Sequence, residues 1–137
     1  MKTREFSIST DHEGMYNITA RLREVIRESG VQSGLAVVYC PHTTAGITIN
    51  ENADPDVRSD MARIYDRLVR EGEPYYDHVL EGADDMPAHA KCNLTGVSLN
   101  IPITRGRLGL GTWQGIYLCE FRDYGGPRRI TATIIGD

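Results

Sequence analysis

Histidine, hydroxyl and carboxylate side chains are concentrated in one short stretch of this chain, residues 41–55. His42, Thr43 and Thr44 lie at its beginning, and Glu51 lies near its end. These groups transfer protons near neutral pH or ligate metal ions. We therefore expect part of an active or binding site here.

The spacing within this stretch limits what one subunit can do. Residues 47–50 alternate between apolar and polar, which predicts a strand. If the strand starts at Gly46, Glu51 lies roughly 17 Å further along at about 3.3 Å per residue. His42 and Glu51 would then not touch the same substrate atom. Either the segment curls, or there are two sites, or a subunit boundary unites the two ends; we favour a site shared between subunits.

A second polar stretch, residues 72–91, has little hydrophobic periodicity but contains His78 and His89. Irregular stretches of this length are uncommon in compact domains and are usually functional or disordered. Its tyrosines, methionine and histidines argue against disorder, so we expect an ordered functional loop. The eleven-residue spacing of the two histidines matches no compact zinc motif.

Three carboxylates lie between these histidines. They could be metal ligands, hydrogen-bond partners for imidazole or magnesium anchors, or they could form an ordinary solvated acidic loop. The sequence leaves these alternatives open. The three are Glu81, Asp84 and Asp85.

Glu120 is unusual because strand alternation places it on the same face as Ile116 and Leu118. A carboxylate on an apolar face is costly unless it is paired or lies at the edge of a site. We expect Arg128, Arg129 or a bound ligand to be that partner.

A glycine-rich segment, residues 106–115, could bind phosphate. Arg107 offers a bidentate fork, and Thr112 and Gln114 add hydrogen-bonding groups. The segment is neither a Walker A loop nor a Rossmann fingerprint. It could equally be a tight connection between strands, with Trp113 packed in the core.

Two helices are indicated around these groups. Residues 19–29 have apolar side chains at helical spacing, and Gly30 supplies a stop. A second helix is expected to begin at Pro55, with Asp54 as its N-cap. Its apolar stripe consists of Val57, Met61, Ile64 and Leu68.

The remainder indicates short strands with glycine-rich turns. The continuous apolar run of residues 35–40 predicts a strand covered on both faces. The other expected strands cover residues 47–50, 98–103, 116–120 and 130–134. We therefore expect a β-rich α+β fold, a β-sandwich-like single domain over residues 1–137 with two flanking helices.

The bulk properties exclude several classes of protein. A net charge of −4 gives no broad basic surface for nucleic acid. No apolar run suits a signal peptide or a membrane span. The three cysteines are scattered and form no Cys-x-x-Cys motif, and two of them lie in apolar strand-like runs. They are Cys40, Cys92 and Cys119. We expect a cytoplasmic protein that binds neither nucleic acid nor membranes.

The motifs described above, taken in order along the whole chain, resemble those of the YjbQ-like family. That family is associated with secondary thiamine-phosphate synthase activity. Between Glu81 and His89 the chain is longer than in some members, which leaves ligand positions in that loop less defined. The matching segments are residues 41–46 and 50–55, His78 with Glu81 and Gly82, Ala88 with His89, residues 98–103 and 110–116, Glu120 with Phe121, and residues 126–128.

The resemblance implies a β-sandwich-like homotrimer with its polar residues lining a pocket near a subunit boundary. It also implies an enzyme that joins a pyrimidine pyrophosphate to a thiazole phosphate and releases pyrophosphate. The alternatives are a metal-dependent hydrolase of a phosphorylated metabolite and a non-catalytic trimer that binds a metal or metabolite.

Chemical types then suggest roles for the candidate residues. The expected ligands of a divalent metal, Mg²⁺ or Zn²⁺, are His42, His78 and His89. The expected catalytic residues are His42, Glu51, Glu81 and Glu120. The expected residues for substrate and phosphate binding are Thr43, Thr44, Arg107, Thr112, Gln114 and Arg128.

Overall fold

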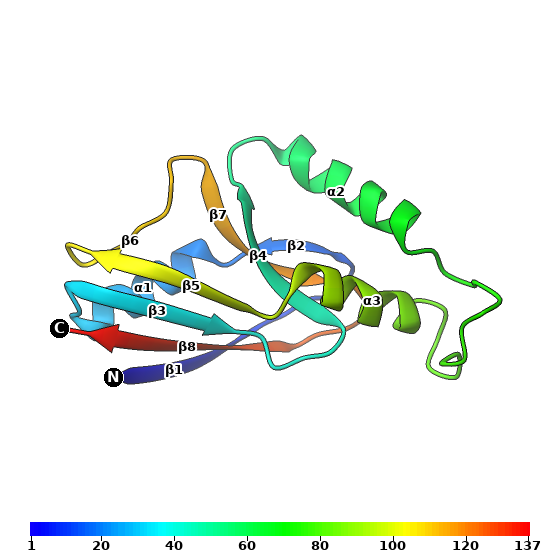
Figure 1. Ribbon diagram of the computed structural model, residues 1–137, viewed down its shortest axis with the longest axis horizontal. Helices are drawn as coiled ribbons and strands as arrows, with labels where there is room; N and C mark the ends of the chain where they lie inside the picture. Colours follow the sequence, from blue (N-terminus) through cyan, green and yellow to red (C-terminus); the bar gives the residue numbers. More distant parts are fainter.

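Two antiparallel sheets face each other in the computed structural model, which describes residues 1–137 (Figure 1). The larger sheet has the strand order β1 (Lys2–Ile8), β8 (Arg128–Gly136), β3 (Ser33–Tyr39), β5 (Ser98–Thr104) and β6 (Arg107–Leu108). The smaller sheet has the order β2 (Gly14–Asn17), β7 (Gln114–Glu120) and β4 (Ala45–Glu51). The expected β-rich α+β sandwich is confirmed.

The smaller sheet is buried on both faces because its central strand alternates between two cores. Ile116 and Leu118 of β7 face the larger sheet and belong to the main core. Tyr117 and Cys119 point the other way, into a second cluster with Ala88. Every residue from 115 to 121 is therefore buried. Strand β7 lies in the middle of the molecule, with helices on its outer side.

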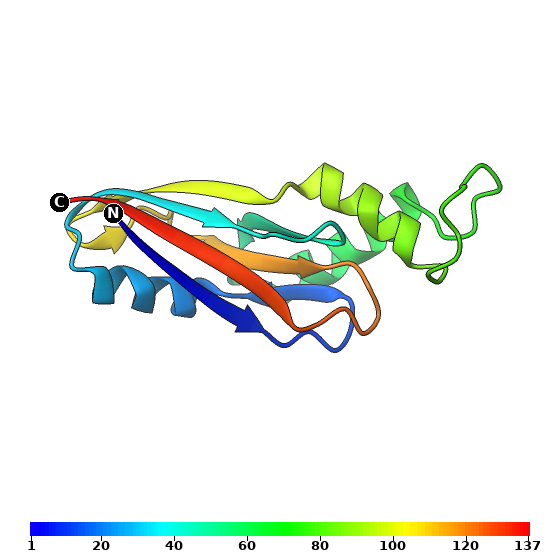
Figure 2. The same ribbon diagram turned by 90° about the horizontal axis from the view of Figure 1, so that it is seen from below.

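The expectation that residues 35–40 are covered on both faces is wrong. Ala36, Val38 and Cys40 are buried in the cores, whereas Tyr39 is exposed and Leu35 is only partly buried. The outer face of the larger sheet has no helix over it: in Figure 2 no helix lies in front of β1, β8 and β3. Its apolar residues are therefore open to a further partner.

The first two helices form where their sequence signals place them. Helix α1 (Thr19–Ser29) ends at Gly30, whose φ of 71° is the left-handed conformation that favours glycine. Helix α2 (Pro55–Leu68) begins as expected, because the Asp54 side chain accepts a hydrogen bond from the Asp56 N–H at 2.9 Å.

A third helix, α3 (Asp85–Thr95), occupies part of the stretch for which a loop was expected. Its periodicity is weak because its buried side combines small and polar residues, including Ala88 and Lys91. It is anchored at its end, where the Ile47 N–H donates to the Gly96 carbonyl at 3.0 Å. A Cβ on Gly46 would lie 2.6 Å from that carbonyl oxygen, so the close approach requires glycine.

Helices α2 and α3 and the connection between them lie at the end of the molecule away from the chain termini (Figures 1 and 2). Residues 69–84 form this connection and are mostly exposed. No helix is long and apolar enough to cross a membrane. The polar residues of the second candidate stretch thus gather at one end of the sandwich.

Candidate metal centre

The side chains of His78, Asp85 and His89 converge at the end of the sandwich that carries α2 and α3. The Nε2 atoms of His78 and His89 both donate hydrogen bonds to Asp85 Oδ2, at 2.6 and 3.2 Å. The two imidazole rings stand edge to face with centroids 5.2 Å apart. One potential ligand atom from each residue lies within 4.8 Å of the others. The cluster is compact enough for a single ion.

Helix α3 explains why Asp85 and His89 meet. They are four residues apart, so they lie on the same face of the helix one turn from each other. His78 reaches the same face from the preceding connection, and its side chain is 44% exposed. Asp85 is the buried member at 2%, so the cluster opens outward through the two histidines.

Arg122 supports the cluster from the connection after β7. Its Nη1 lies 2.8 Å from Asp85 Oδ1, and its Nε donates to Asp84 Oδ2 at 3.3 Å. Its Nη2 also donates to the Glu81 carbonyl at 2.9 Å. Asp85 therefore uses one oxygen for Arg122 and presents the other to the histidines, which fixes the orientation of its carboxylate.

The same contacts keep Asp85 ionised. Burial acts to raise the pKa of Asp85, but the hydrogen bond from His78 and the charge of Arg122 outweigh it. The resulting pKa lies below the ordinary value for aspartate. A charged carboxylate between two imidazoles is a donor set that suits a transition metal.

The donor types fit zinc better than magnesium. Zinc accepts imidazole nitrogen and carboxylate oxygen at about 2.0–2.2 Å, and three protein ligands leave a coordination position open. Magnesium prefers oxygen ligands in a near-octahedral shell. Glu81 could be a further ligand, because its Oε2 lies 4.0 Å from His78 Nε2 and its side chain is 62% exposed.

His42 lies beside this cluster but is already held by the backbone. Its Nε2 accepts a hydrogen bond from the Arg129 N–H at 2.8 Å, which leaves the ring proton on Nδ1. Burial lowers the pKa of His42, and the charges of Arg128 and Arg129 act in the same direction. His42 is thus a neutral imidazole with one nitrogen free.

A hollow of about 560 Å³ connects the two histidine regions. His42 and Thr43 line one side of it, and His89 and Met86 line another. The hollow therefore has walls from both polar stretches of the sequence, residues 41–55 and residues 72–91. A small molecule in the hollow would contact His42 and His89 together.

Glu120 and Arg128 form a buried ion pair that supports the wall behind His42. Arg128 Nη2 lies 2.5 Å from Glu120 Oε2, and its Nε donates to Oε1 at 2.7 Å. Nη2 also donates to Thr44 Oγ1 at 2.8 Å, and Thr10 donates to Glu120 at 2.6 Å. The expected partner of Glu120 is therefore Arg128. Both side chains are satisfied inside the fold, as is Thr44.

The remaining candidate residues lie apart from the cluster. Glu51 is at the far end of the extended strand β4, where its carboxylate accepts hydrogen bonds from the N–H groups of Ala53 and Asp54. Arg107 lines a separate hollow beside α1. Gln114 accepts from the Gly111 N–H within the exposed connection that also contains Thr112, and Trp113 there is 64% exposed. Trp113 does not pack in the core.

Asp85 and Arg122 are the site residues that sequence reasoning did not select. Asp85 had been considered among three carboxylates, and its spacing of four residues from His89 was the available signal. The sequence contains no signal for Arg122, because only the folding of the chain brings this residue next to the cluster.

The chain is similar to known proteins over nearly its whole length. Residues 4–137 match the model of the family described as UPF0047 protein YjbQ-like. The UPF0047 protein YugU of Bacillus subtilis is 48% identical over 126 residues, covering 92% of this chain and 91% of that protein. The YjbQ protein of Salmonella typhimurium is 45% identical over 137 residues, covering 98% and 97%.

Solved structures extend the similarity to the fold. A YjbQ/UPF0047 protein of Clostridium acetobutylicum is 44% identical, with a TM-score of 0.85 over 98% of this chain and all of that one. A protein of unknown function from Sulfolobus solfataricus is 25% identical, with a TM-score of 0.91 over 99% and 97%. The two-sheet architecture is thus common to bacterial and archaeal relatives.

Proposed function

The chain belongs to the YjbQ-like UPF0047 family, and on that premise we propose that it is a metal-dependent enzyme acting on phosphorylated small molecules. The observation that carries this proposal is the convergence of His78, Asp85 and His89, together with the hollow that His89 shares with His42. A divalent metal there would supply positive charge to a phosphate or pyrophosphate group.

The reaction that we place first is thiamine-phosphate synthesis, in which a thiazole phosphate displaces pyrophosphate from a pyrimidine pyrophosphate. The leaving group is strongly anionic, so its departure requires a preorganised positive site. His78, Asp85 and His89 would hold the metal, with Arg122 fixing the carboxylate. Neutral His42 would donate a hydrogen bond from Nδ1 to substrate in the hollow.

A second candidate is hydrolysis of a phosphorylated metabolite in the same hollow. Three protein ligands with an open side are typical of catalytic zinc sites, whereas structural sites are closed by four. The exposure of both histidines favours this candidate. In that case water takes the place of the thiazole acceptor.

We also propose that the protein works as a homotrimer in the cytoplasm. Ile64 and Leu68 of α2 are 53% and 65% exposed, and the outer face of the larger sheet is uncovered. Apolar surface of this kind favours association between copies. Three buried free cysteines suit a reducing compartment.

Turnover assays separate these proposals. Protein loaded with zinc, manganese or magnesium is incubated with both thiamine precursors, and separately with a panel of phosphorylated metabolites. Thiamine phosphate formed by wild type and lost in His89→Ala supports the synthase. Chelator-sensitive phosphate release supports the hydrolase.

His12→Ala is the matched control, because His12 is an exposed histidine paired only with Asp11. Metal-loaded protein that turns over neither set of compounds would contradict the proposal of an enzyme.

A further inference from the structure

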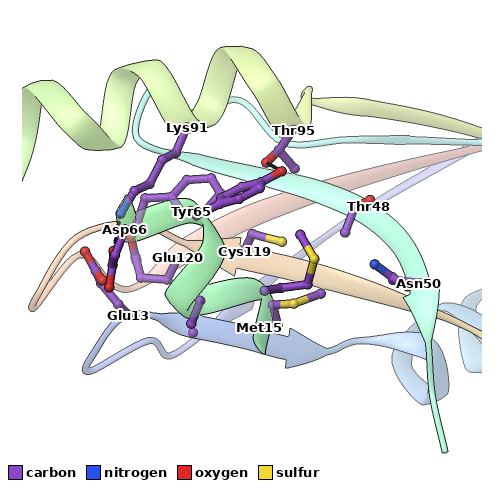
Figure 3. A pocket seen from close by; sticks show the side chains of 14 residues that line it. Glu13, Met15, Thr48, Asn50, Tyr65, Asp66, Lys91, Thr95, Cys119 and Glu120 are labelled. Carbon is purple, nitrogen blue, oxygen red and sulfur yellow. Dashed lines mark hydrogen bonds and ion pairs between the residues drawn. The ribbon is translucent and has the colours of Figure 1, made fainter. Parts of the chain in front are cut away.

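A second cavity, of about 110 Å³, lies on the other side of α3 from the metal cluster. Elements far apart in the sequence form its walls: the start of β2, the middle of β4, helices α2 and α3, and the end of β7 (Figure 3). Met15, Met61 and Phe121 give it an apolar lining. It is a built cavity between packed elements.

The two faces of α3 serve different sites. His89 points to the metal cluster and Lys91 to the cavity, because two residues are about 200° apart around a helix. A ligand in the cavity would therefore not contact the metal ligands.

Charged groups gather at one end of this cavity. Lys91 is 4% exposed, and its Nζ donates to Asp66 Oδ1 at 2.7 Å. The Glu13 side chain lies next to them, at the end away from Thr48 and Asn50 (Figure 3). Asp66 neutralises the lysine charge, so Glu13 adds an uncompensated negative charge.

The Glu13 carboxylate makes no hydrogen bond and no ion pair with a neighbouring side chain. Partial burial raises its pKa to about 7, and Lys91 lowers it by less than burial raises it. Asp66, Asp123 and Asp84 add to the rise. Glu13 is thus a partly desolvated carboxylate, and the charge of Lys91, which Asp66 already pairs, does not offset this desolvation.

We propose that this cavity binds a small organic cation, with its charged group at Glu13 and its apolar body between the methionines and Phe121. The rim is acidic, and Asp66 already pairs with Lys91, the only cationic side chain of the lining, so an anion is repelled. Methionine side chains adapt to the shape of an apolar ligand. Tyr65 and Phe121 pack with ring centroids 5.8 Å apart and add aromatic surface that favours positive charge.

Three probes of one shape and different charge test this proposal: benzamidinium, benzamide and benzoate. Binding to the wild-type protein is followed by NMR of the methionine methyl groups, with Met15 and Met61 as reporters. We expect saturable shifts at these two methyls with benzamidinium, and binding weaker by about tenfold or more with the other probes.

Glu13→Gln keeps the shape of the side chain and removes its charge. We expect this variant to bind benzamidinium about tenfold more weakly, or worse, with an otherwise unchanged spectrum. Glu71→Gln, an exposed carboxylate outside the cavity, is the matched control and should bind as wild type does.

The affinity of wild type should also rise between pH 6 and pH 8 as Glu13 ionises, and this dependence should be absent in Glu13→Gln. Tighter binding of benzoate, equal binding by Glu13→Gln, or no shift at either methyl would overturn the proposal. None of these outcomes depends on the metal cluster or on turnover.

Discussion

At the level of single residues, Asp85 is the centre of the candidate site. Its two oxygens are divided between Arg122 on one side and both histidines on the other. The two imidazoles converge on one carboxylate oxygen, which is the arrangement that a bound cation would replace. The orientation of Asp85 is set before any ligand binds.

Removing one imidazole should therefore remove the metal site. We expect His78→Ala to bind zinc at least about 100-fold more weakly than wild type, because two ligands remain where three were available. Isothermal titration with zinc, supported by metal analysis of the purified protein, measures this change.

The control is His12→Ala, whose histidine lies on the surface. Equal zinc affinity in His78→Ala and wild type would show that the cluster is not the site.

Glu13 should make stability depend on pH. Its pKa is raised to about 7, so the folded state keeps a proton that the unfolded state releases near pH 4.5. Stability is then fully present below the unfolded pKa and is lost as pH rises through 7. The Glu13→Gln variant has no carboxylate to ionise at this position, so its stability should not fall in this way as pH rises.

We expect Glu13→Gln to have a higher free energy of unfolding than wild type at pH 8, by about 1–2 kcal/mol after allowance for partial exposure. The difference should disappear near pH 4. Urea unfolding at the two pH values measures it, and a constant difference at both would contradict the assignment.

At the level of elements, the sequence predicts those helices whose signals lie within the helix and its caps. Helix α2 could be predicted because Asp54 and Pro55 mark its start and its apolar stripe has helical period. Helix α3 could not, because its buried side consists of a small residue, Ala88, which packs on β7, and the polar Lys91, which pairs with Asp66 of α2. The rotation of α3 about its own axis in turn places Asp85 and His89 on the side that faces the cluster.

The surroundings of strand β7 could likewise be predicted only where the signal is local. Alternation placed Glu120 inward and required a partner, and the structure supplies Arg128, eight residues later at the start of β8 in the other sheet. Nothing local indicated that β7 would be covered on both faces. That depends on which sheet lies in front of it and which helices lie behind.

The Glu120–Arg128 pair should be important for stability because it joins β7 to β8 and to Thr44 before β4. We expect Glu120→Leu to lower the free energy of unfolding by about 3–5 kcal/mol, since it leaves a buried guanidinium unpaired. Chemical denaturation measures this.

The double variant Glu120→Leu/Arg128→Met should recover most of the loss, because neither charge of the pair remains. A double variant as unstable as the single one would mean that the pair does more than satisfy its own charges.

At the level of the whole molecule, the functional groups lie at one end of the sandwich and much apolar surface is left uncovered. The sequence predicted that His42 and Glu51 would be separated, and β4 does separate them. It could not predict that Arg107 and the histidines would lie in separate hollows, since this follows from the order of strands in the larger sheet.

Exposed Ile64 on α2 provides a test of assembly. We expect wild type to sediment as three 15.3 kDa chains and Ile64→Glu to shift toward the single chain, because a charge in an apolar interface is costly. Analytical ultracentrifugation measures both. Arg67→Gln, an exposed polar position on the same helix, should sediment as wild type does.

We expect His78, Asp85 and His89 to bind one metal ion together. Anomalous diffraction at the zinc edge, from crystals grown with stoichiometric zinc, tests this expectation directly. We expect one peak per chain at about 2.0–2.2 Å from His78 Nε2, His89 Nε2 and an oxygen of Asp85. A zinc peak elsewhere, or none at this cluster, would contradict it.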